Sequence, residues 1–254
     1  MTSTRVLVTG AAGAIGSAFW HTTHAALTLR LADIRAETLW SAPHEAVALD
    51  VTDYASCLAA CKDIDVVLHL AGDPSPDADF HSSLLPTNIV GTYNIFSAAQ
   101  AQGCRRVVFA SSAQAVEGYP LDVQVNEAMA PRPKNMYGAS KAFGEGVAAS
   151  FAHQFGMTTL AVRIANVADF QPGQSHSPRD VAAFISERDV VQLLARCVEA
   201  ELHGYHVVHG VSDNRYKRLA IDATRALLQY APADDAFDLL NIPGGARPRQ
   251  GPNA

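Results

Sequence analysis

A tyrosine and a lysine four residues apart, Tyr137 and Lys141, could exchange a proton with a bound substrate. At this spacing both side chains lie on one face of a helix, one turn apart. A tyrosine is a weak acid with an ordinary pKa of about 10, and a neighbouring ammonium lowers that pKa because it favours the phenolate. The sequence therefore predicts that Tyr137, helped by Lys141, acts as the acid–base group of a reaction at a hydroxyl or carbonyl.

Two serines, Ser111 and Ser112, end an apolar run that begins at Arg106. The carboxyl ends of parallel strands are where such folds bind ligands. We expect both serines at the substrate site. Ser112 is the better candidate to hydrogen-bond the reacting oxygen beside Tyr137, and Ser111 to pack or cap locally.

A glycine-rich segment, GAAGAIG at residues 10–16, follows the first apolar run and opens the first helix. Gly10 permits a tight turn, Gly13 lets the backbone approach a pyrophosphate, and Gly16 lets the helix pack on the strand. The helix N-terminus adds free N–H groups and the positive end of a dipole. The spacing is G-x-x-G-x-x-G rather than G-x-G-x-x-G. The expected cofactor contacts here are Gly10, Ala12, Gly13, Ala14 and Ile15.

Acidic residues after two further apolar runs predict how an adenosine would be held. Asp33 ends the second run, where a carboxylate can accept both ribose hydroxyls and would repel a 2′-phosphate. This favours NAD over NADP, although Arg35 nearby could accommodate the phosphate. Asp50, followed by Val51, could accept the adenine amino group or instead cap a helix or turn. After the fourth run, room for a cofactor ribose is left by Leu70, Ala71 and Gly72.

These groups lie at the ends of alternating strands and helices. Short runs that are apolar almost throughout are typical of strands buried on both faces of a parallel sheet. We expect strands at residues 5–9, 27–33, 46–50, 65–71, 106–112 and 158–165. We expect helices between them near residues 13–24, 54–62, 80–103 and 135–155. The alternation predicts an α/β fold, a Rossmann-type doubly wound parallel sheet.

After Ala165 the strand–helix alternation ends in a long polar loop. We expect the elements that follow it to form a small C-terminal substrate-binding part. We expect a helix near 187–201, a strand at 205–211 and a helix near 218–228. The predicted organisation is an NAD-binding domain with the catalytic residues at 1–165, and a substrate-binding part at 166–242 interleaved with it. Residues 243–254 are rich in glycine and proline, which predicts a disordered tail.

Composition excludes several classes of function. The 254 residues are 48% hydrophobic and 17% charged, with a net charge of −6. The dense basic spots, at 105–106 and 215–218, are too short for a nucleic-acid surface, which argues against nucleic-acid binding. No signal peptide and no membrane-spanning run of about 20 apolar residues is expected. The four cysteines match no zinc or disulfide spacing and the ten histidines no metal spacing. We therefore expect a cytoplasmic protein without a metal site.

Together these motifs resemble the extended short-chain dehydrogenase/reductases of the NAD-dependent epimerase/dehydratase family. The resemblance runs from about residue 5 to 165, through VTGAAGAIG, LAD, LDV, HLAG, NIVGTYNI, FASS and YGASK. It implies NAD as cofactor and Ser112, Tyr137 and Lys141 as the catalytic triad. Asn88 in NIVGTYNI resembles a helix asparagine near the family's active site, or is simply a polar residue beginning a helix. Ile164, in VRI, is a further expected cofactor contact.

The resemblance also implies a homodimer, with helices near 88–103 and 137–155 forming a four-helix interface. On the second helix an apolar surface beyond the catalytic face would be given by Ala142, Phe143, Val147 and Phe151. Simple core packing of these residues is the alternative.

Within the family, the chain is similar to the shorter uronate dehydrogenases, which oxidise hexuronic acids to aldaric acid lactones with NAD. The similarity includes APRPKNMYGASKAFGE, FISERDVVQLL and HVVHGVSDN, and a C-terminal part too short to grip a nucleotide diphosphate. It implies that Arg179 binds the substrate carboxylate, for which a bidentate guanidinium is suited; a solvated loop charge is the alternative. Ala113 replaces a substrate-contacting asparagine, Asn166 could stand in for a family serine, and Ser75 is a candidate sugar contact.

We therefore predict an NAD-dependent dehydrogenase that oxidises a hydroxyl of a free sugar or sugar acid. Tyr137 would take the hydroxyl proton while hydride passes to the nicotinamide, with the chemistry supplied by the cofactor. One alternative is a sugar or nucleotide-sugar epimerase or dehydratase with tightly bound NAD. Another is a non-catalytic NAD-binding regulator, a class that commonly lacks the tyrosine or the lysine.

Overall fold

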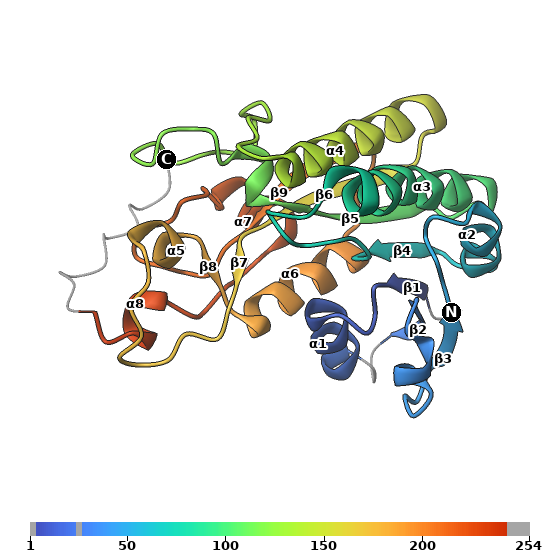
Figure 1. Cartoon of the computed structure of the whole chain (residues 1–254), viewed down its shortest axis with the longest axis horizontal. Helices are drawn as coiled ribbons and strands as arrows, with labels where there is room; N and C mark the ends of the chain where they lie inside the picture. Colours follow the sequence, from blue (N-terminus) through green and yellow to red (C-terminus); the bar gives the residue numbers. More distant parts are fainter. Residues whose placement is uncertain (1–3, 24–26, 243–254) are drawn as a thin grey trace.

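A seven-stranded parallel sheet organises the chain, of which the computed structural model describes residues 4–23 and 27–242 (Figure 1). The strand order is β3-β2-β1-β4-β5-β6-β9, so the order reverses between β1 and β4, where such sheets bind ligands. The predicted Rossmann-type fold is confirmed. The strands are β1 (Arg5–Thr9), β2 (Thr28–Asp33), β3 (Glu45–Ala48), β4 (Val66–His69), β5 (Arg106–Ser112), β6 (Thr158–Ile164) and β9 (Tyr205–Gly210).

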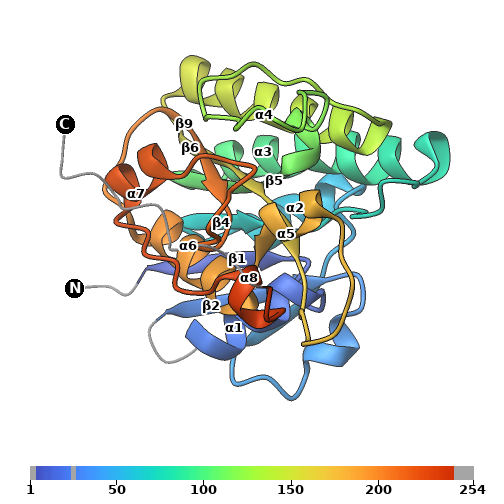
Figure 2. The ribbon, with the colours of Figure 1, turned by 90° about the vertical axis from the view of Figure 1, so that its left-hand side faces the viewer.

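Helices cover both faces of the sheet, as Figures 1 and 2 show. Alternate residues along a strand point to opposite faces: Val6 and Val8 pack in the core beneath α1 and α6, and Leu7 in the core beneath α2, α3 and α4. The bounds of these helices are α1 (Ala14–Thr23), α6 (Glu187–Glu199), α2 (Tyr54–Cys61), α3 (Thr92–Ala101) and α4 (Met136–Phe155).

The expected apolar outer surface of α4 is only partly present. Val147 and Phe151 are buried in the core, whereas Phe143 is 40% exposed. Val147 and Phe151 therefore pack in the core, which was the alternative, because they face α3 and the sheet.

The helix expected at 80–103 is two consecutive helices. A π-helix, η2 (Phe80–Gly91), contains Pro86 and leads into α3. Proline has no N–H to give to an α-helical ladder and its ring clashes with the preceding turn, so an α-helix is not continuous through this point. The helix expected from 218 begins at Asp222 because Leu219 first forms a β-bridge with Val125.

Short elements complete the fold near the carboxyl ends of the strands. They are η1 (Ala36–Leu39), η3 (Ala113–Val116), β7 (Asn166–Val167), α5 (Pro178–Ala182), β8 (Phe184–Ile185), α7 (Asp222–Leu228) and α8 (Ala236–Leu239). β7 and β8 pair as a separate two-stranded sheet. Among the described helices, none is long and apolar enough to cross a bilayer.

The part after Ala165 is built into the main sheet. β9 pairs in parallel with β6 from Thr159–Tyr205 to Ile164–Gly210. The fully buried carboxylate of Asp189 then fixes the following chain, since it accepts hydrogen bonds from the Ser212 hydroxyl and from backbone N–H groups of residues 233 and 234. The tail predicted at 243–254 lies outside the described residues.

Candidate active site

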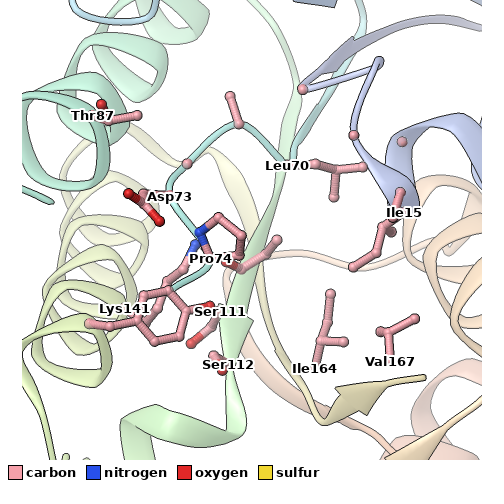
Figure 3. A pocket seen from close by; sticks show the side chains of 18 of the residues that line it. Ile15, Leu70, Asp73, Pro74, Thr87, Ser111, Ser112, Lys141, Ile164 and Val167 are labelled. Carbon is pink, nitrogen blue, oxygen red and sulfur yellow. The ribbon is translucent and has the colours of Figure 1, made fainter. Parts of the chain in front are cut away.

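A cavity of about 850 Å³ lies at the carboxyl ends of the central strands and is lined by residues from Asp33 to Tyr137. Figure 3 shows part of its lining, including Ile15, Ser112 and Lys141. This volume is in the range of small-molecule sites. The predicted site residues that line the cavity include both those expected to contact the cofactor and those expected to contact the substrate. They are Gly10, Gly13, Ala14, Ile15, Asp33, Asp50, Val51, Leu70, Ala71, Gly72, Ser111, Ser112, Ala113, Tyr137, Lys141, Ile164, Asn166 and Arg179.

The glycine-rich turn has the shape of a phosphate cradle. Gly10 has φ of +68°, and a Cβ on it would lie 2.8 Å from the backbone nitrogen of Ala71, so only glycine fits there. A Cβ on Gly13 would meet only the Gly10 carbonyl, at 3.2 Å, and Gly13 lines the cavity. The N-terminus of α1 follows directly, so its first N–H groups and dipole suit a pyrophosphate.

Ala12 does not line the cavity, and its backbone N–H and carbonyl are hydrogen-bonded to residues 33 and 35. Its N–H donates to Asp33 Oδ2 over 3.0 Å, and its carbonyl accepts from Arg35 Nη2 over 3.2 Å. Asp33 Oδ1 also accepts from the N–H of Arg35, so the turn and the acidic end of β2 form one unit. The side chain of Arg35 remains 59% exposed beside this carboxylate.

Asp50 lines the cavity and does not cap a helix. Its Oδ1 accepts from the N–H and the hydroxyl of Thr52, which makes it a turn residue, and the cap of α2 is Asp53. Val51 beside it is buried against Gly91, where a Cβ would overlap the valine side chain.

The catalytic candidates meet where α4 begins against β5. Asn135 caps α4 by accepting from the N–H of Gly138 over 2.7 Å, which places Tyr137 in the first turn and Lys141 in the second. Ser112 and Tyr137 line the same end of the cavity, and Ser112 acts to lower the pKa of the Tyr137 hydroxyl. The Lys141 ammonium donates to the carbonyl of Ala110 over 3.0 Å and lies 5.7 Å from the centre of the Tyr137 ring.

The pKa of Tyr137 departs from its ordinary value in the direction opposite to the prediction. Burial raises this pKa, Ser112 acts the other way but is outweighed, and the Asp73 carboxylate raises it further. Burial also lowers the pKa of Lys141 to about 8. The lysine therefore does not by itself make Tyr137 a stronger acid. An oxidised nicotinamide is positively charged and, when bound, would favour the phenolate.

Ser111 lines the cavity, but its hydroxyl is engaged in the interior. It donates to Glu145 Oε1 over 2.6 Å, and Glu145 pairs with Arg163 through contacts of 2.9 and 2.8 Å. Both charged side chains are almost fully buried. This agrees with local packing rather than substrate contact for Ser111.

The structure does not bring Asn88 or Ser75 to the cavity wall. The buried Asn88 amide donates to the carbonyl of Asp73 and to the Ser140 hydroxyl, and its Oδ1 accepts from the N–H of Asp73 over 2.8 Å. Asn88 thus holds the loop after β4 against α4. Ser75 is exposed, and its hydroxyl accepts from the N–H of Asp77 in a local turn.

Asp73 is a cavity residue that sequence reasoning missed. Its Oδ2 accepts from the Ser83 hydroxyl and its Oδ1 from the N–H of Ser75. Figure 3 shows it on the same side of the cavity as Ser112 and Lys141, with Ile15 on the other side. The available signal was an acidic residue directly after HLAG. Further missed lining residues include Thr87 and Gln114.

Arg179 reaches the cavity from the start of α5, with its guanidinium already paired. Nε and Nη2 donate to the two carboxylate oxygens of Glu117 over 3.0 and 2.7 Å, and Nη1 donates to Asp180 Oδ1 over 3.1 Å. Burial acts to lower the pKa of Arg179, but the Glu117 contact outweighs it and the pKa is raised. Asn166, in β7, and Ala113, in η3, line the same end.

Comparisons with known proteins show which family the chain resembles over most of its length. The model of the NAD dependent epimerase/dehydratase family matches residues 6–218. An NAD-dependent glucose-6-phosphate dehydrogenase from Haloferax volcanii is 34% identical over 250 residues, covering 92% of this chain and 94% of the relative. A uronate dehydrogenase from Pseudomonas putida is 32% identical over 213 residues, covering 83% of this chain and 77% of the relative.

The chain is also similar to solved structures of uronate dehydrogenases. The crystal structure of uronate dehydrogenase from Agrobacterium tumefaciens has a TM-score of 0.84 and 30% sequence identity, and the match covers 98% of this chain and 93% of that one. The chain belongs to the NAD-dependent epimerase/dehydratase family.

Proposed function

We propose that this protein is an NAD-dependent dehydrogenase that oxidises a hydroxyl of a free sugar or sugar acid. The observation that carries the proposal is one continuous cavity that joins the glycine cradle and Asp33 to Tyr137, Ser112 and Lys141. Its relatives of similar length include a glucose-6-phosphate dehydrogenase and uronate dehydrogenases, which supports a sugar rather than a nucleotide sugar.

The chain's own residues account for positioning and proton transfer. NAD, when bound, would supply the acceptor for the hydride that leaves the substrate carbon. Ser112 hydrogen-bonds the reacting hydroxyl and Tyr137, as phenolate, accepts its proton, so that the alcohol becomes a carbonyl. Lys141 binds the nicotinamide ribose, and its hydrogen bond to the Ala110 carbonyl, which holds it against β5, supports this role. Asp33 reads the adenosine ribose.

The test is NADH formation by the purified protein, with NAD, on a panel of aldoses, uronates and nucleotide sugars. We expect NADH from at least one free sugar or sugar acid. Conversion of only a nucleotide sugar, with tightly held NAD and no net NADH, would instead identify an epimerase. NAD binding without turnover of any hydroxy compound would identify a regulator.

We further propose that residues 1–165 bind the cofactor, that residues 166–242 select the substrate, and that the protein is a cytoplasmic homodimer. Support for the dimer comes from exposed apolar side chains on η2, α3 and α4, which include Val90, Tyr93 and Phe143. Support for a reducing compartment comes from the four cysteines, all buried and unbridged. Light scattering of wild type and Tyr93→Asp tests the dimer, which the charge should dissociate.

A further inference from the structure

The guanidinium expected to bind a substrate carboxylate already has carboxylates bound to it. Arg179 uses its Nε/Nη2 edge on both oxygens of Glu117 and a third donor on Asp180. That edge has the geometry by which arginine takes a carboxylate in two parallel hydrogen bonds. Glu117 therefore takes the two hydrogen bonds that Arg179 would otherwise offer to a substrate carboxylate.

Glu117 is held firmly in this place. It directly follows η3, five residues after Ser112, so the same strand end positions both. Its side chain is 8% exposed, and a second guanidinium, that of Arg218, lies 3.8 Å from Oε1. Arg218 in turn donates to three backbone carbonyls, at residues 119, 120 and 123. The two guanidiniums and the two carboxylates, Glu117 and Asp180, balance in charge.

The opposite side of the substrate end carries a negative charge. Asp73 lines the cavity close enough to Tyr137 to raise the pKa of that tyrosine. Apart from the catalytic Lys141, Arg179 is the one cation among the described lining residues at this end, since Arg35 lies beside Asp33 at the adenosine end. A carboxylate on the substrate would therefore lose its hydration without gaining an unpaired cation, which is unfavourable.

We propose that Glu117 is the residue that determines specificity in this site, and that by holding Arg179 it selects a sugar without a carboxylate, an aldose rather than a uronate. The hydroxyls of such a sugar can donate to Asp73 and bond to Asn166, and need no free guanidinium. This inference rests on the proposed sugar dehydrogenase activity.

The experiment compares kcat/KM for NADH formation on sugar pairs that differ only at C6, glucose with glucuronate and galactose with galacturonate. We expect the wild type to prefer the aldose in each pair by at least about tenfold, the ratio that one charge-assisted hydrogen bond typically sets. Equal or better use of the uronates would overturn the inference and leave the proposed dehydrogenase standing. No NADH from any free sugar would overturn both.

Two variants test the residue itself. Glu117→Gln keeps the size of the side chain and removes its charge, so the uronate-to-aldose ratio of kcat/KM should rise at least about tenfold. Asp180→Asn alters only the more exposed partner and should move the ratio in the same direction by less. Asp222→Asn, an exposed carboxylate on α7, is the control and should leave the ratio unchanged. If Asp180→Asn and any folded Glu117→Gln protein keep the wild-type ratio, Glu117 does not set specificity.

Discussion

The Asp73 carboxylate and the Tyr137 hydroxyl face one cavity from different elements, and the first raises the pKa of the second. Asp73 follows β4 and Tyr137 opens α4, so the two are brought together only by the fold. The negative charge disfavours the phenolate that oxidation requires. In the free enzyme Tyr137 is therefore protonated, and the positive charge of a bound nicotinamide would favour release of that proton.

Replacing Asp73 by asparagine should shift the pH profile of oxidation. With the negative charge removed, the pKa of Tyr137 falls, so the acidic limb of kcat/KM against pH moves to lower pH. The profile is measured for wild type, Asp73→Asn and the distant Asp222→Asn control. A limb that stays in place in Asp73→Asn would show that Asp73 does not act on Tyr137.

Removal of the Tyr137 hydroxyl should strongly slow turnover and spare cofactor binding. Tyr137→Phe keeps the ring packed but cannot accept the proton, so kcat should fall by about 10²–10⁴-fold. The Kd for NAD, followed by fluorescence quenching, should be unchanged because the cradle and Asp33 are untouched. Full activity in this variant would contradict the proton-transfer role.

Asp33 should control the choice between NAD and NADP. In Asp33→Ser the repulsion of a 2′-phosphate is lost while the exposed Arg35 remains nearby, so the NADP-to-NAD ratio of kcat/KM should rise by more than about tenfold. Adding Arg35→Ala should reverse most of that gain. An unchanged ratio in Asp33→Ser would mean that this carboxylate does not read the ribose.

Removing one member of the buried Glu145–Arg163 pair behind Ser111 should destabilise the fold strongly, whereas replacing both members by apolar residues should not. Arg163→Met leaves Glu145 buried without its partner, and should lower the free energy of unfolding by about 3–5 kcal/mol. The double variant Arg163→Met/Glu145→Leu removes both charges and should recover most of this loss. Urea unfolding of the three proteins checks this, and equal losses in the single and double variants would contradict it.

The sequence predicted those parts of the fold and site that depend on local patterns. Buried apolar runs and the glycine spacing placed the strands and the cradle within a few residues, and the tyrosine–lysine spacing needs only one helix. It did not predict the break at Pro86, because an apolar helical pattern continues through residues 80–103 while the proline changes the hydrogen-bond ladder.

Local sequence patterns could not predict which charged groups pair at the substrate end of the cavity. Glu117 and Arg179 are 62 residues apart, and their bidentate contact depends on how η3 and α5 pack. The direction of the Tyr137 pKa likewise depends on burial and on Asp73, neither of which the Tyr137–Lys141 spacing contains. The sequence predicted Arg179 as a site residue, but it did not predict that Glu117 would pair with it.

The pairing of β9 with β6 has a consequence for how such a chain can change over evolution. Within the described residues 166–242, the two-residue strands β7 and β8 form the one separate sheet, and the longest strand, β9, is an edge of the main sheet. This part cannot be exchanged as a self-contained module, because removal would expose the side of β6. A substitution in this part is therefore made on a backbone that the main sheet holds in place.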